Sequence, residues 1–183
     1  IETMLDYFIQ RGEEPLLRLY DDRTVQKLIQ TFPGKFIITE DRSYFDYVYN
    51  IEELTKLPGK RFHAKKNHVN RFKRSYDFEY HRMTPADAPE CMELFDRWYD
   101  NKKDEIPGID EEREAVQELM SNWEYLDILG GCLRVEGKMA AFSLGEPLCG
   151  KMVVIHLEHA DTEFEGSFAA MNQQFLEHEW QDY

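Results

Sequence analysis

The sequence predicts a mixed α/β fold, of the α+β kind, with a mostly antiparallel sheet flanked by helices. Three short apolar runs follow one another between residues 131 and 159, and only turn residues separate them, as in an antiparallel meander. Apolar residues at intervals of three and four predict helices before and after these runs. The chain has 183 residues, 42% of them hydrophobic, so it can bury a sizeable core and is not predominantly disordered.

The N-terminal stretch alternates helical and extended patterns. Apolar residues at helical spacing predict a helix over residues 1–9, and since no cap precedes it we expect an upstream segment. Residues 15–20 predict a short strand. Thr24 is expected to cap a helix over residues 25–32, which the Pro33-Gly34 pair ends.

A hairpin and a basic helix are expected next. Runs 35–40 and 44–49 are rich in β-branched and aromatic residues, and they predict two strands joined by a turn at residues 41–43. Residues 51–57 predict a helical turn that Pro58-Gly59 ends. In the basic stretch that follows, three apolar residues share one helical face and leave most of the cations on the others: Phe62, Val69 and Phe72.

From residue 78 onward the pattern is strand, two helices, three strands and a final helix. Residues 78–83 alternate as a strand, and residues 84–87, Thr-Pro-Ala-Asp, supply an N-cap, a proline and an acid for a helix start. Residues 106–108 separate that helix from the next. The three strands are expected at Gly131–Glu136, Met139–Gly145 and Met152–His159. The final helix is expected to bury Phe164, Phe168, Met171 and Phe175.

Charge is distributed unevenly. The formal net charge is −14, yet eight of the 22 Lys and Arg residues lie between Lys56 and Arg74, where no acid occurs. The remaining 14 cations face 36 acids, a balance of −22, which argues against DNA or other general polyanion binding. One local anion site is compatible with this pattern, and a solvated helix face is the alternative interpretation.

Cysteine usage and hydropathy indicate the cellular compartment of the protein. Cys91, Cys132 and Cys149 show no CxxC spacing and no companion His pair, so the sequence predicts neither a disulfide framework nor a metal site. No run reaches the roughly 18 apolar residues that a membrane-spanning helix needs, and no signal peptide is visible. We therefore expect a cytoplasmic protein without a membrane span.

Several separated motifs carry a family resemblance. Residues 57–72, LPGKRFHAKKNHVNRF, residues 130–146, GGCLRVEGKMAAFSLGE, residues 153–160, VVIHLEHA, and residues 172–175, NQQF, occur in that order. Together they resemble bacterial proteins related to the C-terminal catalytic domain of phosphatidylglycerol lysyltransferase. The likeness runs from about residue 35 to about residue 180. The element order from residue 78 is also the order in which a GNAT-type acyltransferase domain begins.

The resemblance implies a tandem pair of GNAT-like domains that transfers an aminoacyl group from charged tRNA, or an acyl group, to an acceptor. Residues 1–76 would then be the second half of a first GNAT-like domain that ends in the basic helix, and residues 77–183 the first part of a second. A segment is expected at each end. The resemblance leaves the acceptor and the oligomeric state open.

Two carboxylates are the candidate catalytic groups. Acyl or aminoacyl transfer needs a base near the reacting carbonyl, and Glu146 and Glu158 end adjacent predicted strands. If the two share a cleft, each raises the proton affinity of the other. Exposed strand-end acids are the alternative interpretation. His159 stands where relatives often have Lys, which weakens any phosphate-binding role at that position.

Donor binding is expected on the basic helix and at the start of the final helix. The candidates for contact with tRNA or another phosphate-bearing donor are Lys65, Lys66, His68, Arg71, Gly166 and Ser167. Asn172 is expected to give structural support. The coenzyme A loop of GNAT proteins has an Arg or Gln followed by two spaced glycines, and this chain supplies only Gly166.

The sequence leaves three functions open. The first is an acyl or aminoacyl transferase whose donor is aminoacyl-tRNA or acyl-coenzyme A. The second is a non-catalytic GNAT-like binding or scaffold module, which the incomplete glycine loop favours. A nucleic-acid-binding domain is a third, although a single basic helix on an acidic body supports it poorly.

Overall fold

The computed structural model describes residues 1–183 in two compact units, Ile1–Val48 and Tyr49–Tyr183. The first unit holds α1 (Glu2–Gln10), α2 (Asp22–Thr31) and the short 3₁₀ helix η1 (Arg42–Tyr44), and none of its residues is buried. Both predicted helices are thereby confirmed. The N-cap of α2 is Asp21, whose side chain accepts a hydrogen bond from the Thr24 backbone at 2.7 Å, so the prediction of Thr24 as the cap is wrong.

The strands predicted for this unit are absent. Residues 15–20 and the two runs 35–40 and 44–49 form no strand, and η1 occupies the predicted turn. Ile37 is 99% exposed. β-Branched residues favour a strand when they pack on a half-buried sheet surface, and this unit offers them none.

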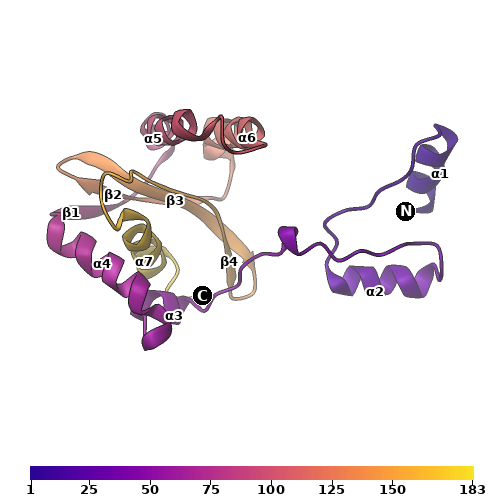
Figure 1. The fold of residues 1–183 in the computed structure, drawn as a ribbon, viewed down its shortest axis with the longest axis horizontal. Helices are drawn as coiled ribbons and strands as arrows, with labels where there is room; N and C mark the ends of the chain where they lie inside the picture. Colours follow the sequence, from indigo (N-terminus) through magenta and orange to yellow (C-terminus); the bar gives the residue numbers. More distant parts are fainter. The chain divides into compact units, whose positions relative to one another are not determined.

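A four-stranded antiparallel sheet organises the second unit (Figure 1). Its strands lie in the order β1 (Phe78–Arg82), β2 (Leu129–Val135), β3 (Lys138–Cys149) and β4 (Met152–Ala160), each pairing with the next. The predicted α/β class with an antiparallel meander is confirmed. The order strand, two helices, three strands and helix is the GNAT-like order expected from the sequence.

Helices cover both faces of the sheet. In Figure 1, α4 (His63–Ser75) and α7 (Ser167–Glu179) lie below the sheet, and α5 (Ala88–Lys102) and α6 (Ile109–Asn122) lie above it. Short helical segments complete the unit: α3 (Ile51–Lys56), η2 (Lys60–Phe62), η3 (Pro85–Asp87) and η4 (Trp123–Tyr125). None of the helices combines the length and the apolar character that crossing a bilayer demands.

The chain uses the predicted stop and start signals around these helices. Thr84 and Asp87 form a capping box, in which the Thr84 backbone donates to the Asp87 carboxylate at 2.9 Å before α5 begins. Gly108 and Gly166 precede α6 and α7 with φ values of 81° and 89°, a left-handed conformation that favours glycine.

Each face of the sheet has its own apolar core. Under α4 and α7, Phe72, Leu133 and Phe175 are among the fully buried residues, while Phe95 and Phe142 are buried under α5. The basic helix α4 therefore packs within the second unit through its apolar stripe. The predicted division into tandem domains at residue 76 stays a prediction.

One predicted core residue is misplaced. Phe168 is 40% exposed, so the prediction that it packs against the sheet is wrong. The buried face of α7 is instead set by the residues that follow Gly166 at helical spacing: Ser167, Ala170, Met171, Gln174, Phe175 and Leu176. Phe168 comes one position after Ser167 and falls on the edge of this face.

Candidate functional site

Glu158 lies on β4 and is directed toward α7. It pairs in register with Ser143 of β3, whose side chain is fully buried and donates to the Leu157 carbonyl at 3.1 Å. The Glu158 carboxylate accepts a hydrogen bond on Oε2 from Asn172 Nδ2 of α7 at 3.1 Å. The predicted base is thus only partly exposed and is held by a neutral side chain.

A third element contributes a charge to this group. Lys65 Nζ of α4 donates to Asn172 Oδ1 at 2.7 Å, so the Asn172 amide stands between an ammonium and a carboxylate. Lys65 lies between the buried Phe62 of η2 and the buried Val69 of α4. Its four-carbon stem can cover apolar surface while the charged end reaches the polar atoms of α7. We call Glu158, Asn172 and Lys65 the carboxylate network.

Burial shifts the proton affinities within the carboxylate network. Withdrawal from water raises the pKa of Glu158, while the Asn172 hydrogen bond and the Lys65 charge oppose the rise. Withdrawal from water also lowers the pKa of Lys65, and the Glu158 charge opposes that change. A carboxyl group whose pKa is raised toward the working pH is suited to accept and return a proton.

Glu146, the second predicted carboxylate, lies on the other face of the sheet. Leu144 pairs with Leu157 and Gly145 with Ile155, so a bulge at His156 shifts the register between β3 and β4. Ile155 packs in the core under α7, and by alternation Glu146 lies on the face covered by α5 and α6. The expectation that the two carboxylates share a cleft is therefore wrong.

Glu146 has a partner that the sequence analysis did not single out. His156 Nε2 lies 2.8 Å from Glu146 Oε1, and both side chains are about one third exposed. Glu146 pairs in register with Val154, and His156, the bulged residue, reaches Glu146 from a diagonal position. A hairpin register drawn from the sequence alone has no signal for this bulge.

His159 follows Glu158 but lies on the opposite face. Its ring packs among Phe95, Trp98 and Phe142, with centroid distances of 4.7, 5.1 and 6.0 Å. Burial lowers the pKa of His159 to about 4, so the ring is neutral at neutral pH. A neutral ring among aromatic side chains is a packing element and offers no charge to a phosphate.

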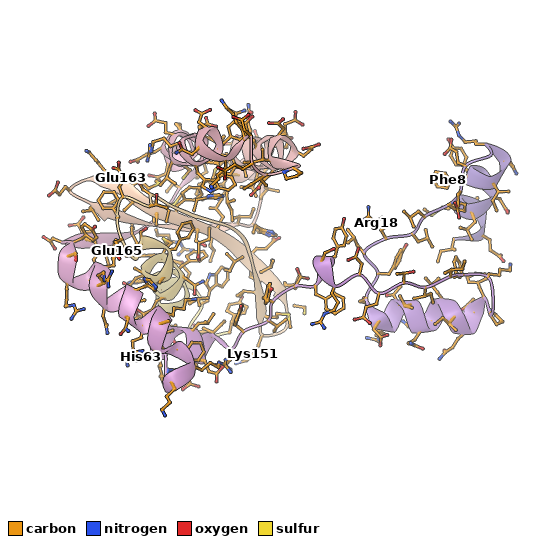
Figure 2. All side chains as sticks on the ribbon, viewed as in Figure 1. Phe8, Arg18, His63, Lys151, Glu163 and Glu165 are labelled. Atoms are coloured by element: carbon orange, nitrogen blue, oxygen red, sulfur yellow. The ribbon has the colours of Figure 1, made fainter.

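The predicted donor-binding cations of α4 divide into two groups. Lys66, His68 and Arg71 are exposed, and Arg71 also forms an ion pair with Glu165, whereas Lys65 is only partly exposed and belongs to the carboxylate network. Figure 2 shows Glu165 beside α4, in the connection that leads from β4 to α7. The structure therefore leaves three of these four side chains exposed on α4, and the charge of one of them, Arg71, is paired.

The start of α7 is packed against α4. A Cβ built on Gly166 would lie 2.4 Å from the His68 carbonyl oxygen, so only glycine allows the two backbones to approach this closely. The Ser167 hydroxyl donates to the Asp161 carbonyl at 3.0 Å. Both predicted phosphate-binding residues thus have contacts within the protein.

The whole chain matches the model of a known protein family. The model of the family described as phosphatidylglycerol lysyltransferase, C-terminal, matches residues 1–183. The chain belongs to this family. The resemblance seen in the sequence motifs is thereby confirmed, and no curated protein gives a significant match.

A solved structure shows a strong likeness to this chain. A conserved protein of unknown function from Bacteroides thetaiotaomicron VPI-5482 is 35% identical, with a TM-score of 0.87 over 96% of this chain and 60% of that chain. The chain thus spans about three fifths of the length of that protein.

Two further likenesses are weak. The C-terminal domain of an Agrobacterium fabrum protein described as a lysylphosphatidylglycerol synthetase has a TM-score of 0.44 at 16% identity, covering 68% of this chain and 39% of that one. The PaiA N-acetyltransferase of Thermoplasma acidophilum, in complex with coenzyme A, has 0.37 at 12%, covering 55% and 72%. At these TM-scores, neither structure supports a conclusion about this protein.

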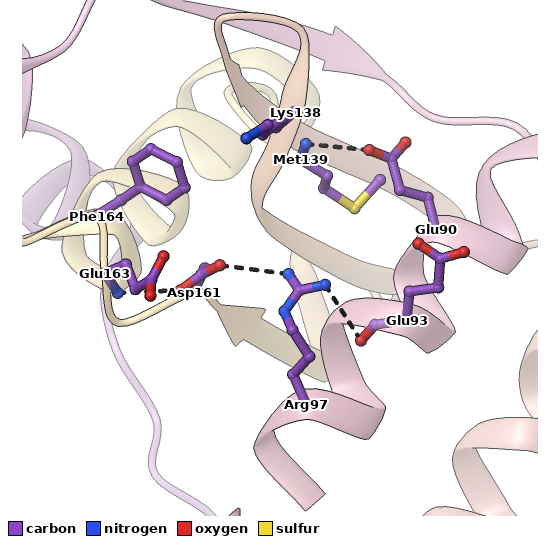
Figure 3. A pocket seen from close by; sticks show the side chains of 8 residues that line it. All are labelled: Glu90, Glu93, Arg97, Lys138, Met139, Asp161, Glu163 and Phe164. Atoms are coloured by element: carbon purple, nitrogen blue, oxygen red, sulfur yellow. Dashed lines mark hydrogen bonds and ion pairs between the residues drawn. The ribbon is translucent and has the colours of Figure 1, made fainter. Parts of the chain in front are cut away.

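A pocket of about 360 Å³ opens where α5 meets the end of β4 (Figure 3). Arg97 of α5 reaches across it and contacts the Asp161 carboxylate at 3.3 Å. Its lining is rich in acids, and no group of His, Cys, Asp or Glu in the chain is placed to bind a metal ion. The lining residues are Glu90, Glu93, Arg97, Lys138, Met139, Asp161, Glu163 and Phe164.

Proposed function

We propose that this chain transfers an acyl or aminoacyl group, with Glu158 as the proton-transfer residue. The observation that carries the proposal is the carboxylate network, in which a carboxylate of raised pKa is held by Asn172 in reach of the Lys65 charge. The family assignment and the GNAT-like order of elements support transfer to an acceptor as the general reaction. Neither fixes the donor or the acceptor.

The chemistry assigns Glu158 two consecutive roles. The Glu158 carboxylate takes a proton from an amine or hydroxyl acceptor as that group attacks the donor carbonyl. Collapse of the tetrahedral intermediate breaks the bond to the leaving oxygen or sulfur, and the protonated Glu158 returns its proton to that atom. One group can serve both steps because its pKa is raised toward the working pH.

Aminoacyl-tRNA is the donor that the surface favours. Lys60 and Lys66 are exposed and Lys73 and Arg74 extend the basic surface along α4, which suits contact with phosphates. The connection from β4 to α7 is unfavourable for a pyrophosphate because it carries several acids. These acids are Asp161, Glu163 and Glu165.

A non-catalytic binding or scaffold module is the second candidate. The observation that favours it is the close contact between Gly166 and the His68 carbonyl, which closes the helix start that binds phosphate in many α/β proteins. This candidate and the transferase make different predictions for the fate of a bound donor.

Separate titrations and a single-turnover assay distinguish the candidates. Chain 1–183 is titrated with lysyl-tRNA, uncharged tRNA and acetyl-coenzyme A, and loss of radiolabelled lysine from the tRNA is followed with hydroxylamine as surrogate acceptor. The transferase predicts salt-dependent tRNA binding and lysine loss above the protein-free background. Binding without loss of lysine would favour the scaffold, and a chain that binds neither tRNA nor coenzyme A would contradict the proposal.

A further inference from the structure

We propose that Lys65 is a positioning residue of the transfer site and not part of the anion-binding surface of α4, and that it acts on Glu158 through Asn172. The inference deepens the proposed function, since Glu158 is the group that it concerns. It separates Lys65 from its neighbour Lys66, which the sequence places in the same basic segment.

Lys65 and Lys66 have opposite environments. Lys65 lies between the buried Phe62 and Val69 on the inner face of α4, where its Nζ contacts Asn172 Oδ1 at 2.7 Å. Lys66 is exposed on the outer face. A turn of helix places consecutive residues about 100° apart, so two adjacent lysines can serve two different surfaces. The inner one faces α7 and β4, and its ammonium group donates to Asn172.

The two contacts of Asn172 fix its orientation. Its oxygen accepts from the Lys65 ammonium, and its amide nitrogen donates to Glu158 Oε2 at 3.1 Å. The reversed amide would place its nitrogen against the ammonium and its oxygen against the carboxylate, and both contacts would be repulsive. Lys65 thereby selects the orientation in which Asn172 donates to Glu158.

This orientation leaves one carboxylate oxygen for chemistry. The structure gives Glu158 a hydrogen bond on Oε2 only, so Oε1 is available for the proton of an acceptor. The neighbours of Glu158 on α7 and β3, Asn172 and Ser143, are neutral. Lys65 on α4 is the charged group that acts on it. Loss of the Lys65 charge therefore favours the protonated carboxyl and frees the Asn172 amide to turn.

A matched pair of variants tests the assignment. Glu158 is followed by carboxyl carbon NMR in the ¹³C-glutamate-labelled chain across pH 3 to 9, and its signal is assigned by its absence in Glu158→Gln. The variants are Lys65→Met, Lys65→Arg, Lys66→Met and Asn172→Ala, each checked for folding by circular dichroism. The same variants are titrated with uncharged tRNA at several salt concentrations.

We expect the Lys65 and Lys66 variants to give different results in both measurements, the Glu158 titration and the salt dependence of tRNA binding. Lys65→Met and Asn172→Ala raise the titration midpoint of Glu158, Lys65→Arg restores it toward the wild-type value, and Lys66→Met leaves it unchanged. Lys66→Met reduces the slope of log affinity against log salt by about 1, and Lys65→Met leaves it unchanged. If Lys65→Met fails to fold, Lys65→Gln takes its place.

Two results would overturn the proposal. One is a Glu158 titration in Lys65→Met that coincides with that in Lys66→Met. The other is an equal loss of salt slope in both variants, which would return Lys65 to the anion surface. The NMR result is independent of turnover, so a chain that transfers nothing but shows the expected midpoints would remove the proposed function and keep the role of Lys65.

Discussion

Glu158 and His159 are neighbours in the sequence, both are largely withdrawn from water, and they lie on opposite faces of β4. His159 packs among three aromatic rings, and burial lowers its pKa to about 4. Burial raises the pKa of Glu158, but the Asn172 hydrogen bond and the Lys65 charge oppose the rise. Burial alone makes a titratable group neutral and inert, whereas burial with polar partners leaves it able to exchange a proton.

The comparison of Glu158 with His159 requires that the two faces of the sheet are equally well packed and differ only in their polar groups. Phe142 under α5 and Phe175 under α7 are both buried, at 0% and 1% exposure. Replacement of either by alanine should lower the free energy of unfolding by about 3–5 kcal/mol, as measured by urea denaturation. Phe168→Ala, on the exposed edge of α7, is the control and should cost less. A loss below about 1 kcal/mol at Phe142 or Phe175 would show that its face is loosely packed.

His159 should make the fold sensitive to acid. Because its pKa falls from 6.5 in the unfolded chain to about 4 in the folded one, the unfolded chain binds the extra proton between these values. Stability should therefore fall as the pH drops from about 6.5 to about 4, with a contribution of about 3 kcal/mol.

The variant His159→Phe isolates this contribution. Urea unfolding at pH 7 and pH 4.5 should show a smaller loss in the variant than in the wild-type chain, because phenylalanine fits the aromatic surroundings and does not titrate. Equal losses in the two proteins would show that His159 is accessible to protons in the folded state.

Glu158 should show the opposite dependence on pH. Its pKa is raised in the folded chain, so the folded chain binds more protons just above pH 4.5, and stability decreases as the pH rises through the folded-state value. Glu158→Gln keeps the acceptor for Asn172 and removes the charge, so it should be more stable than the wild type at pH 8 and not at pH 4. A Glu158→Gln chain that is less stable at pH 8 would mean that the buried charge is fully compensated by its partners.

The smallest effect is expected at the exposed pair on the other face. Glu146 and His156 are each about one third exposed, and such ion pairs contribute between about 0.2 and 1 kcal/mol. Glu146→Gln should therefore change the urea midpoint only slightly at pH 6. A loss comparable with that of a core truncation would show that the bulge in β4 depends on this pair.

The sequence predicted the sheet much better than it predicted the first unit. The strands β2 to β4 and the start of α5 follow from apolar alternation and turn residues that the second unit satisfies locally. The residues at 35–40 have the same β-rich composition, yet they form no strand, since composition does not supply a partner strand.

The three residues of the carboxylate network were singled out in the sequence, but their arrangement was not predicted. Glu158, Lys65 and Asn172 were each singled out, yet Lys65 and Asn172 are separated by 107 positions, and their contact depends on how α4 packs on α7. The expectation that Glu146 and Glu158 share a cleft was wrong for a different reason. Glu146 stands three positions after Ser143, the register partner of Glu158, and side chains an odd number of positions apart on a strand lie on opposite faces.

The most direct test of the account is the single-turnover rate of lysine loss from lysyl-tRNA in Glu158→Gln, with Glu146→Gln as the matched control, between pH 6 and pH 9. If Glu158 transfers the proton, its replacement should lower the rate by about 10² to 10⁴ while tRNA affinity and the fold are retained. Glu146→Gln should keep a rate close to that of the wild-type chain, because Glu146 lies on the other face. A Glu158→Gln chain that reacts at the wild-type rate across this range would contradict the account.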